Sequence, residues 1–107
     1  MAREEISNLI EKSIKELQKE KVFPKFEIPE IRVEKPEEKI YGDYATNIAM
    51  VIAKIVKKNP VEIAEIIKSK VKSQKSKVLG EVEIAKPGFI NFFLSKDYLQ
   101  KQVNEIL

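Results

Sequence analysis

The sequence GEVEIAKPGFINFFL, residues 80–94, predicts a β-hairpin. Val82 and Ile84 alternate with charged or small neighbours, which is the pattern of a strand with one buried face. Pro87-Gly88 is typical of a turn, and Phe89–Leu94 then forms the second strand. We therefore expect a small antiparallel sheet near the end of the chain.

Helical patterns surround this hairpin. Apolar residues recur at helical spacing in residues 3–21, in residues 45–56 and again after Pro60. We expect Asn59 to cap the third helix and Asp43 the second, because such side chains accept hydrogen bonds from the free amides of a first turn. A last helix begins at Ser95.

The extended segment between the first two helices completes the predicted order. Residues 26–34 alternate in polarity, but Pro29 cannot donate to a ladder and restricts them to an edge or bent strand. The predicted order is α-β-α-α-β-β-α, an α+β domain with a small antiparallel sheet of three or four strands packed against helices. A length of 107 residues suits one domain, residues 1–107.

Composition argues against a complete enzyme. The chain has no His and no Cys, so it lacks the commonest general base, a thiolate nucleophile and zinc-thiolate ligands. Its acidic residues show no metal-loop spacing, and no metal site is expected. No apolar run reaches the ~18 residues of a membrane span, and the acidic start does not fit a targeting peptide. We expect a cytoplasmic protein that does not contact a membrane.

The net charge of +3 conceals a basic segment, which begins at Lys54, Lys57 and Lys58. Residues 54–77 contain eight Lys against two Glu. Such a surface attracts polyanions, and salt weakens that attraction. A solvated face of a Lys-rich helix explains the same composition, so the charge pattern leaves both interpretations open.

The second strand of the hairpin carries different side chains on its two faces. At strand period they divide into two sets: Ile90, Phe92 and Leu94 against Phe89, Asn91 and Phe93. If helices cover only the first set, the second offers rings that stack on unstacked bases and an amide that pairs with a base edge. Lys86 at the turn is within reach of a phosphate. The alternative is that all three Phe are core and the sheet satisfies the amide.

A second group of aromatic and polar residues is YGDYATN, residues 41–47. Helix capping is the simpler role for Asp43, because an acid/base role would need a His, a Cys or a second clustered carboxylate. Tyr41 and Tyr44 are either available to a partner or packed over the helix end.

Several short motifs, taken in order, resemble the N-terminal additional domain of arginyl-tRNA synthetases. They are VEKP at 33–36, GDYATNIAM at 42–50, AK at 53–54, NP at 59–60, IA at 63–64 and PGFINF at 87–92. The resemblance covers nearly the whole chain and departs at Tyr41, where the family often has His. The chain contains no HIGH-like or KMSKS-like sequence and so lacks the ligase active site.

The resemblance implies a non-catalytic domain that precedes a catalytic domain and contacts the D-loop corner of tRNA. The partners implied are an arginine-accepting tRNA and that catalytic domain, where ATP and Mg²⁺ would bind; no cofactor is implied here. The residues expected to contact tRNA are Phe89, Asn91, Phe93, Lys86, Lys54, Lys57 and Lys58. The main alternative is a protein-interaction or interdomain docking module, in which the basic segment only maintains solubility.

Overall fold

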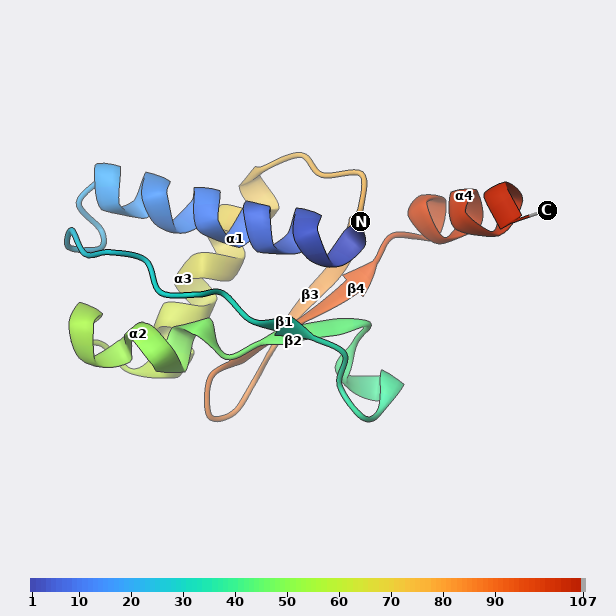
Figure 1. Cartoon of the computed structure of the whole chain (residues 1–107). Coiled ribbons are helices and arrows are strands. Elements are labelled where there is room, and N and C mark those ends of the chain that lie inside the picture. The colour runs from blue at the N-terminus through green and yellow to red at the C-terminus, as the bar shows by residue number, and fades with distance from the viewer. Residues whose placement is uncertain (107) are drawn as a thin grey trace.

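The computed structural model describes the backbone of residues 1–106 and the side chains of residues 1–101 (Figure 1). Leu107, the last residue of the predicted domain, lies outside the described residues. In chain order the elements are α1 (Ala2–Lys19), β1 (Val33–Glu34), the 3₁₀ turn η1 (Lys39–Tyr41), β2 (Tyr44–Thr46), α2 (Ile48–Val56), α3 (Pro60–Ser73), β3 (Leu79–Ala85), β4 (Phe89–Leu94) and α4 (Lys96–Ile106). This order confirms the predicted α+β class. Among the described helices, none is long and apolar enough to cross a membrane.

The four strands form one antiparallel sheet in the order β1-β2-β4-β3. β3 and β4 pair as the predicted hairpin, with Ile84 opposite Ile90. β2 pairs with the other edge of β4 and places Ala45 opposite Asn91. β4 is therefore an inner strand, and its two faces meet different surroundings.

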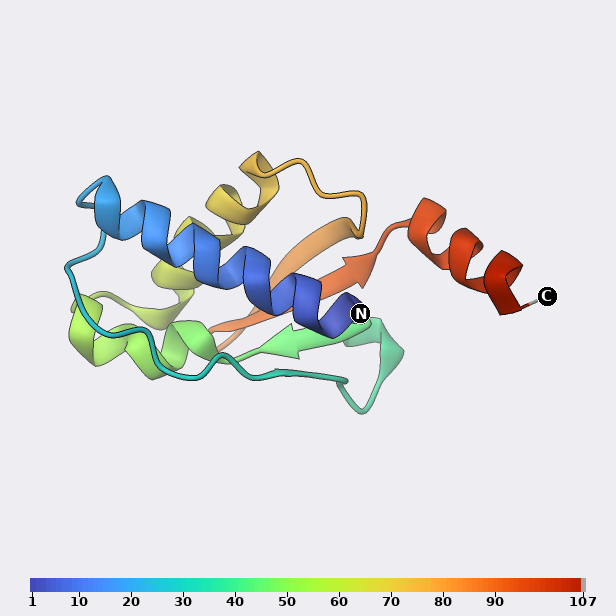
Figure 2. The same ribbon diagram turned by 45° about the horizontal axis from the view of Figure 1, so that its top comes forward.

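Helices cover one face of this sheet. α1 and α3 lie on the same side of it in Figure 1 and in the turned view of Figure 2, and α2 lies at one end. α4 projects away from this body. The helix-covered side buries one apolar cluster, to which α1 contributes a stripe at helical spacing: Ile6, Ile10, Ile14 and Leu17. Phe92 and Ile90 of β4 are fully buried against the same cluster.

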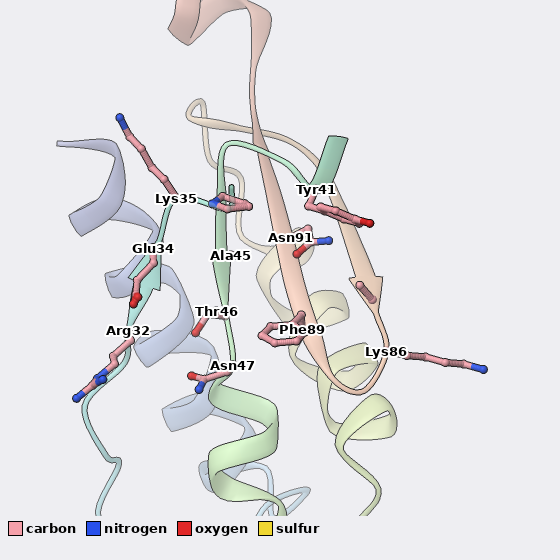
Figure 3. Close-up of a pocket in the computed structure, with 12 residues that line it drawn as sticks. Arg32, Glu34, Lys35, Tyr41, Ala45, Thr46, Asn47, Lys86, Phe89 and Asn91 are labelled. Atoms are coloured by element: carbon pink, nitrogen blue, oxygen red, sulfur yellow. The ribbon is translucent and has the colours of Figure 1, made fainter. Parts of the chain in front are cut away.

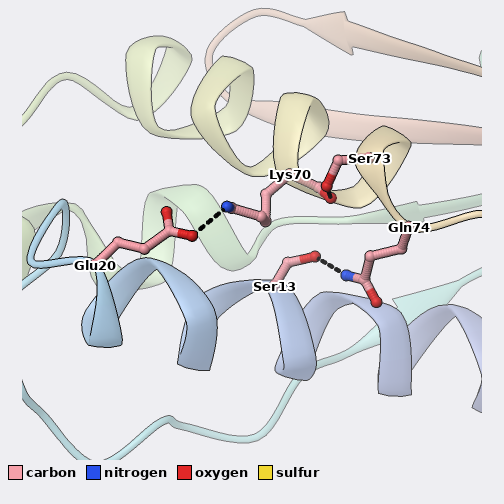
Figure 4. Close-up of polar contacts among 5 residues, drawn as sticks. All are labelled: Ser13, Glu20, Lys70, Ser73 and Gln74. Carbon is pink, nitrogen blue, oxygen red and sulfur yellow. Dashed lines mark hydrogen bonds and ion pairs between the residues drawn. The ribbon is translucent and has the colours of Figure 1, made fainter.

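Polar contacts also join α1 to α3 (Figure 4). The Nζ of Lys70 lies 2.7 Å from Oε2 of Glu20. The amide of Gln74 donates to the hydroxyl of Ser13 and, at 3.1 Å, to the carbonyl of Leu9. Ser13 is fully buried, so the contact with Gln74 satisfies a hydroxyl that would otherwise lose its hydrogen bond to water.

Two of the predicted element boundaries were wrong. Only Val33–Glu34 of the extended segment 26–34 pairs in the sheet, since the segment lies along the helices for most of its length. Residues 44–46 form a strand before the second helix, which begins only at Ile48. The N–H of Ile48 donates to Oγ1 of Thr46 at 3.3 Å, and this local bond accompanies the change from strand to helix.

The start of α3 matches its prediction. Oδ1 of Asn59 accepts a hydrogen bond from the N–H of Val61 at 2.9 Å, and Pro60 occupies the first helical position. Asn59 is therefore the N-cap of this helix. The helix runs to Ser73.

Candidate nucleic-acid interface

The face of the sheet opposite α1 and α3 is open. Strand pairing aligns one row of residues across it: Glu34, Ala45, Asn91 and Glu83. Phe89 lies two residues from Asn91 on β4 and therefore shares this face. The division predicted for residues 89–94 is confirmed, because the intervening Ile90 and the following Phe92 are fully buried on the helix side.

A depression of about 520 Å³ lies on the open face (Figure 3). Its floor includes Ala45 on β2 and Ala85 on β3, which lie on either side of β4. Ala45 is opposite Asn91, and Ala85 is opposite Phe89. Two methyl side chains at these positions leave the space beside the central strand unfilled.

Asn91 is the buried polar group of this depression. Only 5% of its surface is exposed, and its carboxamide forms no hydrogen bond with any described residue. The amide atoms keep some access from the depression, because the described part of the chain has no fully buried side-chain polar atom without a partner. An amide in this state lacks bonds worth about 1 kcal/mol or more, which a ligand can supply.

Two aromatic rings accompany Asn91. Phe89 is 40% exposed and Tyr41 is 51% exposed, and both line the depression. Figure 3 shows them on opposite sides of Asn91. Exposed flat rings beside an unpaired amide are suited to planar ligands that also carry hydrogen-bonding edges.

Cations predominate at the rim. Arg32, Lys35 and Lys86 line it together with one acid, Glu34. Nε of Arg32 lies 3.3 Å from Oε1 of the exposed Glu30, whereas Lys35 and Lys86 form no ion pair with a described residue. The excess of positive charge favours an anionic ligand over a neutral one.

The turn that carries Tyr41 is fixed to β4 by the two residues that follow it. Gly42 has φ +99°, and a Cβ atom there would lie 2.8 Å from the carbonyl oxygen of Phe92. The N–H of Asp43 donates to that same oxygen at 2.8 Å. Oδ2 of Asp43 in turn accepts a hydrogen bond from the N–H of Leu94 at 2.9 Å.

The prediction that Asp43 caps the second helix was therefore wrong. A strand, β2, lies between Asp43 and the first residue of α2, so its carboxylate is beyond reach of the free amides of that helix. It extends the pairing of β2 with β4 instead. In the described part of the chain, Asp43 belongs to no acidic group that could hold a metal ion.

The sequence also matches a known protein family. Residues 4–94 match the family described as "Arginyl tRNA synthetase N terminal domain". The chain belongs to this family. The motifs VEKP, GDYATNIAM and PGFINF indicate the same family.

Similar proteins carry this domain within a longer chain. The arginine–tRNA ligase of Listeria welshimeri is 51% identical over 85 residues, which are 79% of this chain and 15% of that protein. The arginine–tRNA ligase of Caldanaerobacter subterraneus subsp. tengcongensis is 45% identical over 98 residues, 92% of this chain and 17% of that protein. The chain thus spans about a sixth of the length of these relatives.

Solved structures share the fold. The arginyl-tRNA synthetase of Plasmodium falciparum superposes with a TM-score of 0.74 at 26% identity, over 94% of this chain and 17% of that one. The arginyl-tRNA synthetase of Thermus thermophilus has a TM-score of 0.70 at 22% identity, over 95% and 15%.

The structure of this synthetase domain brings together only some of the residues expected to contact tRNA. Phe89, Asn91 and Lys86 line one depression. Phe93 lies farther along β4, is partly buried and does not line it. Lys54, Lys57 and Lys58 are exposed near the end of α2, away from the depression; Lys58 lies 3.7 Å from Glu62. Their phosphate contacts remain predictions.

Sequence reasoning missed Arg32 and Lys35 altogether. Both come from the extended segment that continues through β1, and only the pairing of β1 with β2 brings them to the rim. Asn47 also lines the depression. The sequence around the VEKP motif places Arg32 and Lys35 on either side of Glu34, but Glu30, Glu37 and Glu38 are also near, so the local charge pattern gave no clear signal.

Proposed function

We propose that this domain recognises the D-loop corner of an arginine-accepting tRNA on behalf of a parent arginine–tRNA ligase. The parent activates arginine with ATP and Mg²⁺ in a separate catalytic domain and transfers it to the tRNA. The domain itself contributes affinity and selectivity and catalyses no step. Its coverage of about a sixth of its relatives' length supports a role as one part of a larger enzyme.

The observation that carries the proposal is the unpaired amide of Asn91 beside the exposed ring of Phe89. RNA loops present unstacked bases, which proteins read by stacking on aromatic rings and by hydrogen bonds to base edges. A carboxamide can donate to and accept from the same edge. The 5% exposure of Asn91 matters because a desolvated amide discriminates more sharply against a base that cannot pair with it.

The charges at the rim complete the proposed binding mode. Lys86 and Lys35 are free of ion pairs with described residues and can approach phosphates on either side of a bound base. Contacts to phosphates position the RNA, and contacts to the base give selectivity. Binding should therefore depend strongly on salt and also on the nucleotides of the D-loop.

The test measures binding of the chain to a transcript of an arginine tRNA by fluorescence anisotropy at 50 mM and 200 mM salt. We expect Phe89→Ala and Asn91→Ala each to weaken binding about tenfold, since stacking on a base is worth about 1–3 kcal/mol and a lost edge contact a similar amount. Leu99→Ala is the matched control, because Leu99 is an exposed apolar residue on α4 that does not line the depression.

A transcript whose D-loop comes from a tRNA with another acceptor identity provides the second comparison. We expect it to bind more weakly to the unaltered chain and to lose its sensitivity to Asn91→Ala. Equal affinity of both transcripts for every variant would reject recognition of the D-loop. In the parent enzyme, the same substitutions should lower kcat/KM for tRNA and leave arginine activation unchanged.

A docking role is supported by a different surface. Val51 and Ile55 lie one turn apart on α2 and are 47% and 44% exposed. This pair suits apolar contact with another domain, and such contact should survive about 0.3 M salt, whereas phosphate contacts weaken. Loss of binding to the catalytic domain in Val51→Ser, with tRNA binding unchanged, would assign docking to α2 and leave the sheet face to RNA.

A further inference from the structure

We infer that Tyr41 is a second stacking surface, so that the depression holds two unstacked nucleotides, one on Phe89 and its neighbour on Tyr41. The inference rests on the proposed function. It adds Tyr41 as a residue that contacts RNA and sets the number of bound bases at two. Tyr41 is half exposed, lines the depression and lies on the opposite side of Asn91 from Phe89 (Figure 3).

The position of Tyr41 is built into the fold. Its turn, η1, is closed by hydrogen bonds from Tyr41 N–H to the carbonyl of Glu38 at 3.1 Å and from Gly42 N–H to the carbonyl of Lys39 at 3.0 Å. The Gly42-Asp43 contacts then tie this turn to the strand that carries Asn91. The motif that follows Tyr41 therefore holds the ring beside the depression.

The order of the three side chains favours two bases over one. Phe89 and Asn91 are two residues apart on β4, which is about 6.7 Å along the strand. Figure 3 shows Tyr41 on the other side of Asn91 from Phe89, so the amide lies between the two rings. We therefore assign each ring its own base.

The size and the chemistry of the depression agree with this arrangement. Its volume of about 520 Å³ lies well within the range of pockets that hold ligands larger than one base. The amide of Asn91, between the two rings, can pair with the edge of either base. Lys35 and Lys86 flank the depression, where the phosphates around a two-nucleotide segment would lie.

A double-mutant cycle on Tyr41 and Phe89 tests the inference, with binding of the arginine-tRNA transcript to the full chain as the measurement. We expect Tyr41→Ala to weaken binding about fivefold to tenfold and Tyr41→Phe to leave it unchanged, because the ring and not the hydroxyl stacks. Ile40→Ala is the matched control, since Ile40 is a 72% exposed apolar residue of the same turn that does not line the depression.

The double variant Tyr41→Ala/Phe89→Ala distinguishes two bases from one. Separate bases make the two losses multiply, whereas a single base held between both rings makes the double loss clearly smaller than the product. The smaller loss would overturn the two-nucleotide arrangement. Full affinity in Tyr41→Ala, with a loss in Phe89→Ala, would overturn the role of Tyr41 and leave the proposed function intact. Full affinity in both single variants would reject both proposals.

A short probe gives an independent measurement. In NMR titrations with the isolated D-arm hairpin, a stacked base should shift the ring protons of Tyr41 and Phe89 upfield together. Shifts confined to Phe89 would contradict the second stacking surface. Circular dichroism of every variant checks that a loss of affinity does not reflect loss of the fold.

Discussion

The two faces of β4 show how one strand can serve two purposes. Ile90 and Phe92 on one face are fully buried in the apolar cluster under α1 and α3. Phe89 and Asn91, on the other face, line an open depression. Both faces contain a phenylalanine, so residue type alone does not distinguish them; the helices on one side do.

One face of β4 therefore holds side chains that stabilise the fold, and the other holds side chains that a ligand can contact. A buried ring contributes through the area it removes from water and through close packing. An exposed ring contributes little of either. An unpaired, nearly buried amide has a net cost for stability, which makes its presence on the open face easier to explain by binding than by folding.

Removing the buried ring of Phe92 should cause the largest loss of stability. We expect Phe92→Ala to lower the free energy of unfolding by about 3–5 kcal/mol, because it deletes a fully buried aromatic side chain and leaves a cavity. The domain's total stability is of the order of 5–15 kcal/mol, so this loss is a large part of it. Urea unfolding monitored by circular dichroism provides the measurement.

Phe89→Ala is the natural control on the same strand. Its unfolding free energy should fall by about 1–2 kcal/mol, clearly less than in Phe92→Ala, because the ring is already 40% exposed and its removal leaves no closed cavity. If the two variants lost equal stability, the open face would have to be a second core surface. The comparison between the faces would then fail.

The strand at residues 89–94 was predictable from a local run of six residues, but Asn91 is its one polar side chain, so the sequence left open which of the rings are buried. Asn59 was equally predictable, since an N-cap and its helix are local. The strand Tyr44–Thr46 was not, because three residues are too few to show a period and the partner of its middle residue Ala45, Asn91, is 46 residues away. Because this strand was not predicted, Asp43 was expected at the start of the second helix. Its actual partner, the N–H of Leu94, is 51 positions away.

The candidate site was predictable only where it lies within one segment. Phe89, Asn91 and Lys86 are neighbours in the hairpin, and the family resemblance pointed to them. Arg32 and Lys35 reach the depression through the pairing of β1 with β2, which no local pattern encodes. A site on the face of a sheet contains residues from several strands. Residues on one strand are close together in the sequence and can be predicted together, whereas those on the neighbouring strands cannot.

Replacing the unpaired amide of Asn91 should change the free energy of unfolding less than Phe92→Ala does, and in the opposite direction. We expect Asn91→Leu to raise the free energy of unfolding by about 1 kcal/mol, since a side chain of similar size replaces a poorly hydrated amide without a partner. The same variant should bind the tRNA transcript at least tenfold more weakly. Loss of stability in Asn91→Leu would mean that the amide is satisfied in the folded protein, and its availability to a base would be disproved.

The smallest expected effect is on the salt dependence of tRNA binding, which shows which lysines contact phosphates. Lys86→Gln should reduce the slope of log K against log salt by about 0.7–0.9, the contribution of one phosphate contact, and weaken binding a fewfold at 100 mM salt. Lys57→Gln gives the same loss of charge in a separate depression between the ends of α1 and α2, beside Lys19, Lys21 and Lys25. A slope equal to that of the unaltered chain would confine RNA binding to the open face and overturn the phosphate contact expected of Lys57. An equal fall for Lys57→Gln would instead extend the RNA-binding surface to the basic segment that the sequence indicated, because each phosphate neutralised releases counterions wherever on the domain it is bound.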